Sequence, residues 1–561
     1  MELFRRKDDT MGKNFHNKVV YQVYPKSWKD TTGTGMGDLQ GVIEKLPYLA
    51  DLGIDLLWLN PFYKSPQNDN GYDIADYQSI DPMYGDFDTF DKLVQEASKY
   101  DIGLMLDMVL NHVSTEHDWF QRALAGEEKY QEYFILRKAQ SDGSLPTNWE
   151  SKFGGPAWNQ FGDSNYYYLC LYDKTQADLN WHNPEVREAL YDVVNFWINK
   201  GVQGFRFDVL NVIGKSQELK DAADGIGKSE YTDTPIVHEW VRELNKRTFG
   251  PYDDIITVGE MSSTDVSNSV QYSHSESNEL DMVFSFHHLK VDYKEGSKWT
   301  LMDFDFDELK RLLDHWQTGM QAGNGWNALF WNNHDQPRSN SRFADPVNHP
   351  YESATMLATT IHLLRGTPYI YQGEEIGMTN PNYESIDQYD DVETHNAYRT
   401  LLAQGMNNSE ALAIIQAKSR DNSRTPMQWT SEDQAGFTTG QPWLEVASNY
   451  ENINTQVTDP SQRIRDYYKQ LIRLRKDYVV ISEGTYRSIQ LDHPDVYSYM
   501  REYDNQQVLV FNNFYGKQTA IDVPEDFLKK DARVLIGNYD QHALEQQLVL
   551  QPYESIAFLL E

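Results

Sequence analysis

The chain has a single cysteine, Cys170, among its 561 residues. One cysteine cannot form an intrachain disulfide or build a metal site from several cysteines, so a disulfide scaffold and a cysteine-built metal site are excluded. The sequence also lacks an apolar run long enough to span a bilayer. Residues 1–16 are polar and contain no apolar core of a signal peptide, so we expect a cytoplasmic protein.

Basic residues are scarce, because 50 Lys and Arg stand against 85 Asp and Glu, giving a formal charge of −35. So acidic a surface repels nucleic acid and anionic membranes, and we expect neither as a partner. Hydrophobic residues make up 40% of the chain, which is enough for a large core and excludes a disordered or fibrous protein. We expect a globular monomer that acts on a small molecule.

Eight short apolar runs recur along the chain. They are separated by segments in which apolar residues are spaced as on one face of a helix. They cover residues 19–24, 56–60, 103–110, 204–209, 255–260, 282–286, 327–331 and 367–371. Apolar runs that alternate with helices are typical of a parallel sheet, and eight such units close a (β/α)₈ barrel. The predicted fold class is therefore α/β, with a TIM barrel at its centre.

Two segments depart from this alternation. The segment 113–178 follows the third run, has little periodicity and is too long for a simple loop, so it predicts a small inserted domain. After residue 480 the pattern changes to short alternating runs, which predict an antiparallel β-sandwich. The barrel would then comprise residues 1–112 and 179–480, with the sandwich over 481–561.

Acidic and histidine side chains lie where several of the apolar runs end. Asp107, Asp208 and Glu260 belong to the third, fourth and fifth runs, and His334 and Asp335 follow the seventh. In a barrel these ends form one rim, where catalysis takes place. Each residue alone could be a cap or a salt bridge, but three carboxylates on one rim suit glycoside hydrolysis.

Five short motifs resemble those of the alpha-amylase superfamily. They are DMVLNH (107–112), QADLNW (176–181), GFRFDV (204–209), the strand that ends in Glu260, and NNHD (332–335). The resemblance covers almost the whole chain and implies a retaining double displacement. It implies Asp208 as the nucleophile, Glu260 as the acid/base and Asp335 as the transition-state stabiliser.

The same resemblance implies a set of residues that bind one terminal glucose. They are Asp69 and Tyr72 in NDNGYD (68–73), His112, His334, Arg206 beside the nucleophile, and Arg420 in RDNSRTPMQW (420–429). A pocket closed around one terminal glucose favours exo-action over attack within a polymer.

Longer stretches are similar to the exo-acting branch that contains oligo-1,6-glucosidases, dextran glucosidases and trehalose-6-phosphate hydrolases. Val209, after the nucleophile, resembles the members that do not prefer α-1,4 bonds. PTNWESKFGG (146–155), TVGEMSST (257–264) and FSFHHLKVDY (284–293) resemble the trehalose-6-phosphate hydrolases in particular. The resemblance thus implies hydrolysis of a disaccharide phosphate to glucose and glucose 6-phosphate.

A phosphorylated substrate needs cationic ligands, and in so acidic a protein these must form a local cluster of basic residues. The segment 286–299 supplies one after the sixth run, and we predict His287, Lys290 and Lys298 as phosphate ligands. The alternative is a solvated loop whose lysines point to water.

Metal binding is expected to be weak at most. Some relatives carry a calcium loop after the first strand, but here mostly Thr and Gly lie between Asp30 and Asp38. Calcium prefers several carboxylate or carbonyl oxygens, so we expect no required cofactor and at most weak calcium or magnesium binding by these two residues.

Three other functions are consistent with parts of this pattern. An oligo-1,6-glucosidase would share the catalytic residues and need no phosphate site. A glucosyl transferase would need an altered acceptor site, and we find no arginine-rich loop after NNHDQPR. A non-catalytic binding or scaffold subunit would typically have lost carboxylates that this chain retains.

Overall fold

Eight parallel strands form a closed barrel at the centre of the computed structural model, which describes residues 14–540 and 543–561. The order is β13-β12-β11-β5-β2-β1-β15-β14, and a bridge between Val283 and Asn327 joins its two ends. The strands are β1 (Val20–Val23), β2 (Leu56–Leu59), β5 (Gly103–Val109), β11 (Gly204–Asp208), β12 (Ile256–Glu260), β13 (Met282–Phe284), β14 (Ala328–Leu329) and β15 (Thr367–Tyr371). Each lies within one predicted run, so the predicted barrel is confirmed.

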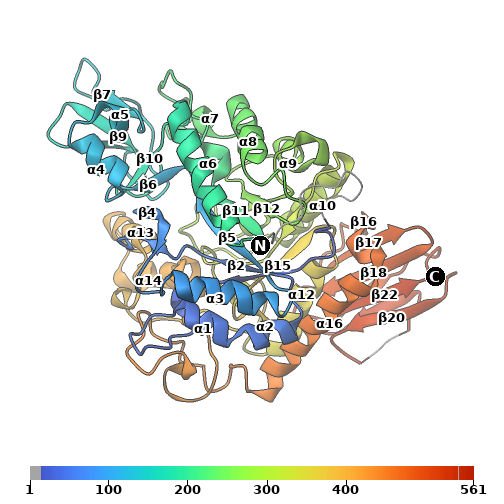
Figure 1. Cartoon of the computed structure of the whole chain (residues 1–561). Coiled ribbons are helices and arrows are strands. Elements are labelled where there is room, and N and C mark those ends of the chain that lie inside the picture. Colours follow the sequence, from blue (N-terminus) through green and yellow to red (C-terminus); the bar gives the residue numbers. More distant parts are fainter. Residues whose placement is uncertain (1–13, 541–542) are drawn as a thin grey trace.

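Amphipathic helices surround this barrel (Figure 1). They include α1 (Leu39–Glu44), α2 (Leu46–Leu52), α3 (Phe87–Ser98), α6 (Pro184–Asn199), α8 (Pro235–Arg247), α9 (Val266–Ser273), α10 (Phe306–Ala322), α12 (Pro350–His362) and α16 (Arg463–Asp477). Asp86, Asn183 and Asp305 begin α3, α6 and α10, where their side chains accept hydrogen bonds from first-turn backbone N–H groups.

The segment after β5 leaves the barrel and returns to it through one pair of strands. β6 (His112–Ser114) and β10 (Gln176–Asp178) are antiparallel, with His112 opposite Asp178. Between them lie α4 (Asp118–Leu124), α5 (Glu128–Gln131) and the sheet of β7 (Leu136–Lys138), β9 (Tyr166–Leu169) and β8 (Trp158–Gln160). This places His112 and Gln176 at the base of the inserted unit, next to the barrel rim.

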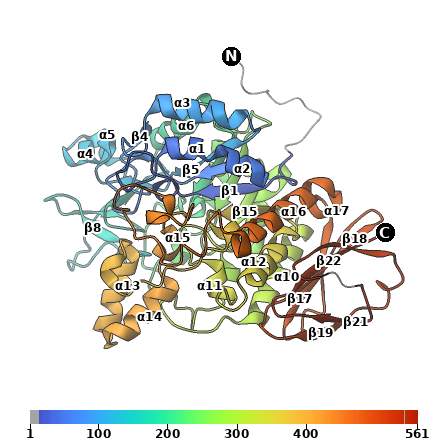
Figure 2. The ribbon, with the colours of Figure 1, turned by 90° about the horizontal axis from the view of Figure 1, so that it is seen from below.

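The carboxyl-terminal part forms two packed antiparallel sheets. The larger consists of β16 (Thr485–Ile489), β17 (Val496–Tyr503), β18 (Gln506–Asn513), β22 (Ser555–Leu560) and β20 (Ala532–Gly537). The smaller, which the sequence pattern did not predict, pairs β19 (Thr519–Asp522) with β21 (Gln547–Leu550). Figures 1 and 2 place this part and the inserted unit at opposite ends of the molecule, so the C-terminal sheets are remote from the rim next to the insertion.

Within the described residues, no helix combines the length and the apolar character needed to cross a bilayer. The prediction that the chain carries no signal peptide rests mainly on residues 1–13, which lie outside the described residues.

Candidate active site

One buried arginine joins three carboxyl groups at the carboxyl ends of neighbouring strands. Arg206 Nη1 lies 2.7 Å from Asp107 Oδ1 and 2.7 Å from Asp208 Oδ1, and its Nη2 donates to Glu260 Oε2. The residues come from β5, β11 and β12, which are adjacent in the barrel. The fold therefore brings together Asp208, Glu260 and Arg206 with Asp107, which the sequence pattern also placed on this rim.

This cluster holds more negative than positive charge when all its carboxyl groups are ionised. Burial raises the pKa of Asp208 well above its usual range; Arg206 opposes this shift, and Glu260 and Asp107 add to it. Burial also raises the pKa of Asp107 to about 6. The carboxyl groups of this cluster therefore disfavour one another's ionisation, and Arg206 offsets part of that repulsion.

Asp335 has the opposite electrostatic environment. Its Oδ1 lies 2.8 Å from Arg424 Nη2 and 3.3 Å from Arg420 Nη1, and its Oδ2 lies 3.2 Å from His334 Nε2. Burial opposes ionisation of Asp335, but His334, Arg420 and Arg424 outweigh it and hold the pKa of this carboxyl far below its usual range. Asp335 is therefore a fixed negative charge beside the Arg206 cluster.

A chain of hydrogen bonds connects His334 to this cluster. Gln22 Nε2 lies 2.9 Å from His334 Nδ1 and donates to Asn60 Oδ1 at 2.8 Å. Asn60 Nδ2 donates to the Tyr72 hydroxyl, which donates in turn to Asp107 Oδ2 at 2.8 Å. The Tyr72 and His334 rings are stacked with centroids 5.1 Å apart, so both are held rigidly at the rim.

The remaining predicted glucose ligands meet on the other side of the same pocket. Arg420 Nη2 lies 3.0 Å from Asp69 Oδ1, and Gln176 Nε2 donates to Asp69 Oδ2 at 3.0 Å. Gln176 Nε2 also lies 3.2 Å from His112 Nε2. Burial raises the pKa of Asp69 to about 7, although Arg420 opposes the shift. The six predicted ligands thus converge on the catalytic carboxylates.

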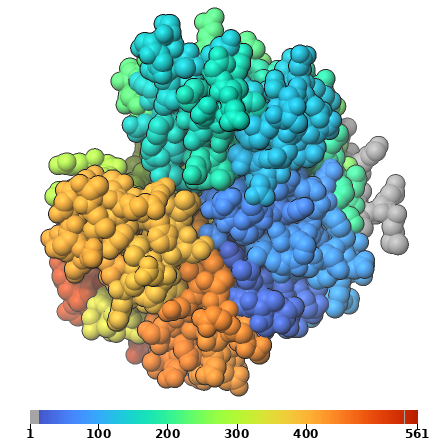
Figure 3. All heavy atoms as spheres, turned by 90° about the vertical axis from the view of Figure 1, so that its left-hand side faces the viewer, coloured from blue at the N-terminus to red at the C-terminus, as the bar shows by residue number. Residues whose placement is uncertain are grey.

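Three segments far apart in sequence meet around these residues. Figure 3 shows the inserted segment in teal, the amino-terminal part in blue and the segment around residues 380–450 in yellow-orange meeting on one face. Their contacts through Asp69, Gln176 and Arg420 lie between these segments. A site bounded by three segments that are joined by these contacts is suited to one terminal sugar ring rather than to a continuous polymer.

The backbone turns sharply just after Asp208. Val209 has φ 37° and ψ 41°, in the left-handed region that β-branched residues avoid. Strain of this kind costs about 1–3 kcal/mol and persists only where the surroundings enforce it. Here the Val209 side chain packs in an apolar cluster with Trp149 and Tyr231, so the inserted domain helps to fix the position of Asp208.

The predicted phosphate ligands have three different environments. Lys298 Nζ lies 2.7 Å from Glu393 Oε2 and is already paired with a carboxylate. His287 Nδ1 is buried without a hydrogen-bond partner in the described chain, and burial lowers the pKa of this ring to about 4. Lys290 is exposed to solvent, and partial desolvation together with repulsion from Lys228 lowers its pKa. Lys290 and His287 are therefore the members left free to bind a ligand.

Asp30 and Asp38 do not offer free oxygens to a metal. The Asp30 carboxylate accepts bonds from the backbone N–H groups of Thr32, Gly33 and Gly35 and from two threonine hydroxyls. Asp38 accepts bonds from Thr31 and caps α1 through the Gly41 N–H. Nowhere in residues 14–540 or 543–561 do three or more His, Cys, Asp or Glu form a suitable metal cluster. These residues do not fit calcium or magnesium.

Sequence reasoning missed two residues that hold Arg420 and Asp335 in place. Asp391 Oδ1 lies 2.5 Å from Arg420 Nη2, and Arg424 lies against Asp335. Arg424 belongs to the RDNSRTPMQW segment, one helical turn after Arg420, so its proximity could have been inferred. No sequence motif around Asp391 marks it as a residue of the site, because only the folding of a distant loop brings it there.

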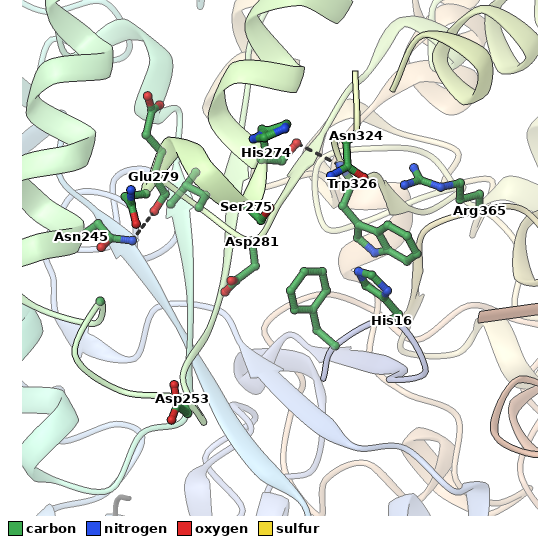
Figure 4. A pocket seen from close by; sticks show the side chains of 15 residues that line it. His16, Asn245, Asp253, His274, Ser275, Glu279, Asp281, Asn324, Trp326 and Arg365 are labelled. Atoms are coloured by element: carbon green, nitrogen blue, oxygen red, sulfur yellow. Dashed lines mark hydrogen bonds between the residues drawn. The ribbon is translucent and has the colours of Figure 1, made fainter. Parts of the chain in front are cut away.

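A cavity of about 370 Å³ lies at the opposite end of the barrel. Figure 4 shows His16, Asp281, Trp326 and Arg365 around it, all from segments that precede strands. The Trp326 ring is stacked on His16 at 3.6 Å and lies 4.6 Å from the Arg365 guanidinium, so both of its faces are occupied. This end of a barrel contributes to stability rather than to catalysis.

Family models match nearly all of the chain. The model described as "Alpha amylase, catalytic domain" matches residues 22–484, and "Alpha-amylase SusG C-terminal domain" matches residues 496–557. The first match contains every residue of the site described above.

Several known proteins are similar over their full length. A trehalose-6-phosphate hydrolase of Bacillus subtilis is 52% identical, covering 97% of each chain, and an oligo-1,6-glucosidase of Bacillus cereus is 42% identical, covering 97% of this chain and 98% of its own. The crystal structure of Bacillus licheniformis trehalose-6-phosphate hydrolase is 51% identical with a TM-score of 0.94, covering 98% of this chain and 100% of its own. An isomaltulose synthase of Erwinia rhapontici has the same coverage, 38% identity and a TM-score of 0.92.

Proposed function

The chain belongs to the alpha-amylase family of glycoside hydrolases, and from this premise we propose that it hydrolyses trehalose 6-phosphate to glucose and glucose 6-phosphate. The proposal rests on similarity over the full chain to trehalose-6-phosphate hydrolases, at 52% identity for the Bacillus subtilis enzyme. The site adds a chemical reason, because Lys290 gives the rim of an acidic protein a basic group without a carboxylate partner among the described residues.

The geometry around Arg206 supports a retaining mechanism. Two carboxyl groups that bond the terminal nitrogens of one guanidinium lie close together, which matches the shorter carboxyl separation of retaining enzymes, about 5–5.5 Å, rather than the longer one of inverting enzymes. Asp208 attacks the anomeric carbon of the unphosphorylated glucose, and Glu260 donates a proton to the bridging oxygen. Glucose 6-phosphate leaves, and water activated by Glu260 then releases glucose from Asp208.

The residues around this pair hold the reacting sugar. Asp335 is ionised and faces the ring, where it can accept hydrogen bonds that strengthen as positive charge develops. Burial lowers the pKa of His334 to about 3, although Asp335 opposes the shift, and the ring nitrogens of His334 can hydrogen-bond the sugar. Asp69 and Arg420 close the far end of the pocket, which restricts cleavage to the terminal unit.

The substrate also indicates where the enzyme acts. A disaccharide that carries a phosphate group does not cross a bilayer unaided, because moving a charge into hydrocarbon is costly. We therefore place the enzyme in the cytoplasm, where such a substrate is held.

Product analysis tests the proposed reaction. Trehalose 6-phosphate incubated with the enzyme should give glucose and glucose 6-phosphate in equal amounts, as followed by proton and phosphorus NMR. Because two displacements restore the starting configuration, the glucose should be released first as its α-anomer. Release of inorganic phosphate with intact trehalose would contradict the proposal, and early β-glucose would contradict the retaining mechanism.

A further inference from the structure

Three lysines lie close enough to repel one another on the Glu260 side of the site, and none has a carboxylate partner among the described residues. They are Lys152 of the inserted domain, Lys228 at the start of α7 (Lys228–Tyr231), and Lys290 after β13. Throughout the part of the chain that the structure describes, these amines form no ion pair with a carboxylate. Lys215, Lys298 and Lys418 of the same region all do, with Asp178, Glu393 and Asp292.

Lys152 is the member of this group that lies deepest. Its Nζ donates to Ser262 Oγ at 2.7 Å, and Ser262 follows Glu260 by two residues. The Ser262 backbone is itself fixed by Asn211, whose side chain bonds both the N–H and the C=O of Ser262. The ammonium group of Lys152 is therefore held close to Glu260, the residue assigned to protonate the leaving sugar.

Several contacts hold the segment that carries Lys152 in this place. The Asn148 side chain exchanges two hydrogen bonds with the backbone of Ala222, and Trp149 Nε1 donates to Lys220 O at 2.9 Å. Trp149 packs with Tyr231 in one apolar cluster. These contacts join the inserted domain to the segment that carries Lys228. Lys152 and Lys228 are therefore held by one connected set of contacts.

One polar group near Lys152 is also left without a partner among the described residues. The Tyr172 ring lies 5.6 Å and the Tyr231 ring 5.7 Å from Lys152 Nζ, and the Tyr172 hydroxyl is buried with no hydrogen-bond partner among the described residues. Burial lowers the pKa of Lys152 to about 7, and repulsion from Lys228 and Lys290 adds to the shift while Glu260 opposes it. A bound anion would cancel this repulsion and bond the free hydroxyl.

We propose that Lys152, together with Lys228 and Lys290, binds the phosphoryl group of the leaving sugar, so that the inserted domain supplies a residue that selects phosphorylated substrates. This inference rests on the proposed function. It assigns to Lys152 a specificity role that the loop 286–299 alone does not fill, because Lys298 of that loop is already neutralised by Glu393.

Substitution of Lys152 by methionine tests the inference, with trehalose 6-phosphate and trehalose as the pair of substrates. We expect kcat/KM for trehalose 6-phosphate to fall about 10- to 100-fold, the loss that accompanies removal of a hydrogen bond to a charged group, mainly through KM. The kcat/KM for trehalose should stay within about threefold of its starting value, because the neutral disaccharide presents no charge to the lysine. Inhibition by glucose 6-phosphate should weaken, and inhibition by glucose should not.

Controls separate a phosphate ligand from a structural residue. Lys138→Met removes an exposed lysine of the same inserted domain and should leave both substrates unaffected. Lys152→Arg keeps the charge and should recover much of the lost activity on trehalose 6-phosphate. Lys228→Met replaces a residue at an exposed position. It should lower kcat/KM for trehalose 6-phosphate but not for trehalose, and this result does not depend on whether Lys152→Met folds well.

Two results would overturn the inference. An equal loss on both substrates would show that Lys152 merely positions Ser262 and Glu260, and unchanged kinetics would show that the phosphate binds elsewhere. Failure of the proposed function is a separate outcome, because it would appear as a lack of preference for trehalose 6-phosphate in the unmodified enzyme.

Discussion

Replacing Asp208 by alanine should lower kcat on trehalose 6-phosphate by a factor on the order of 10⁵, because the first displacement loses its nucleophile. Asp208 ends β11 and is held 2.7 Å from Arg206, which also bonds Glu260, the residue assigned as the acid. The loss should be equally large on unphosphorylated substrates, since the nucleophile acts on the sugar that carries no phosphate. Steady-state kinetics on both substrates measure it.

The variant must remain folded for this result to be informative. Circular dichroism and thermal unfolding should show the barrel intact, because removal of one carboxylate from the Arg206 cluster relieves excess negative charge. Asp163→Ala, at an exposed site of the inserted domain, is a matched control that should leave kcat unchanged. A kcat within tenfold of the unmodified enzyme would show that Asp208 is not the nucleophile.

Replacing Glu260 by alanine should have the second-largest effect, but one that depends on the leaving group. Hydrolysis of trehalose 6-phosphate should fall by about 10³- to 10⁴-fold, because its sugar alcohol leaves poorly without a proton. A p-nitrophenyl α-glucoside needs no such proton, so the glucosyl-enzyme should still form and then accumulate. Added azide, which needs no general base, should react with it and accelerate turnover.

The configuration of the azide product separates the two roles. With Glu260→Ala, two inversions should give α-glucosyl azide, whereas Asp208→Ala with azide should give the β-anomer by one inversion. Proton NMR of the products distinguishes them. The same anomer from both variants, or no response of either to azide, would contradict the assignment of acid/base and nucleophile.

The barrel could be predicted from sequence because its strands are buried on both faces. Each of the eight strands is a short apolar run, and that pattern requires no knowledge of tertiary contacts. The strands β7, β8 and β9 of the inserted domain were not predicted, since they have three or four residues and are partly exposed. The pair β19 and β21 was missed for the same reason.

The residues of the site can likewise be divided into those that the sequence predicts and those that it does not. Asp208, Glu260 and Asp335 could be predicted because each stands in a motif at the end of a barrel strand. Lys152 and Asp391 could not be assigned a role, because their importance arises from contacts between segments that are distant in sequence. For the basic loop, composition indicated a cluster of cations, but only the structure distinguishes the paired Lys298 from the unpaired Lys290.

The central claim, that the enzyme acts on a phosphorylated disaccharide, is tested most directly by three specificity constants. Glucose release from trehalose 6-phosphate, trehalose and isomaltose should be measured side by side, without added metal. We expect kcat/KM for trehalose 6-phosphate to exceed each of the others by about 100-fold or more. Only this substrate carries a phosphoryl group that can pair with Lys152, Lys228 and Lys290. A higher kcat/KM for isomaltose would contradict the claim and identify the enzyme as an oligo-1,6-glucosidase with the same catalytic carboxylates.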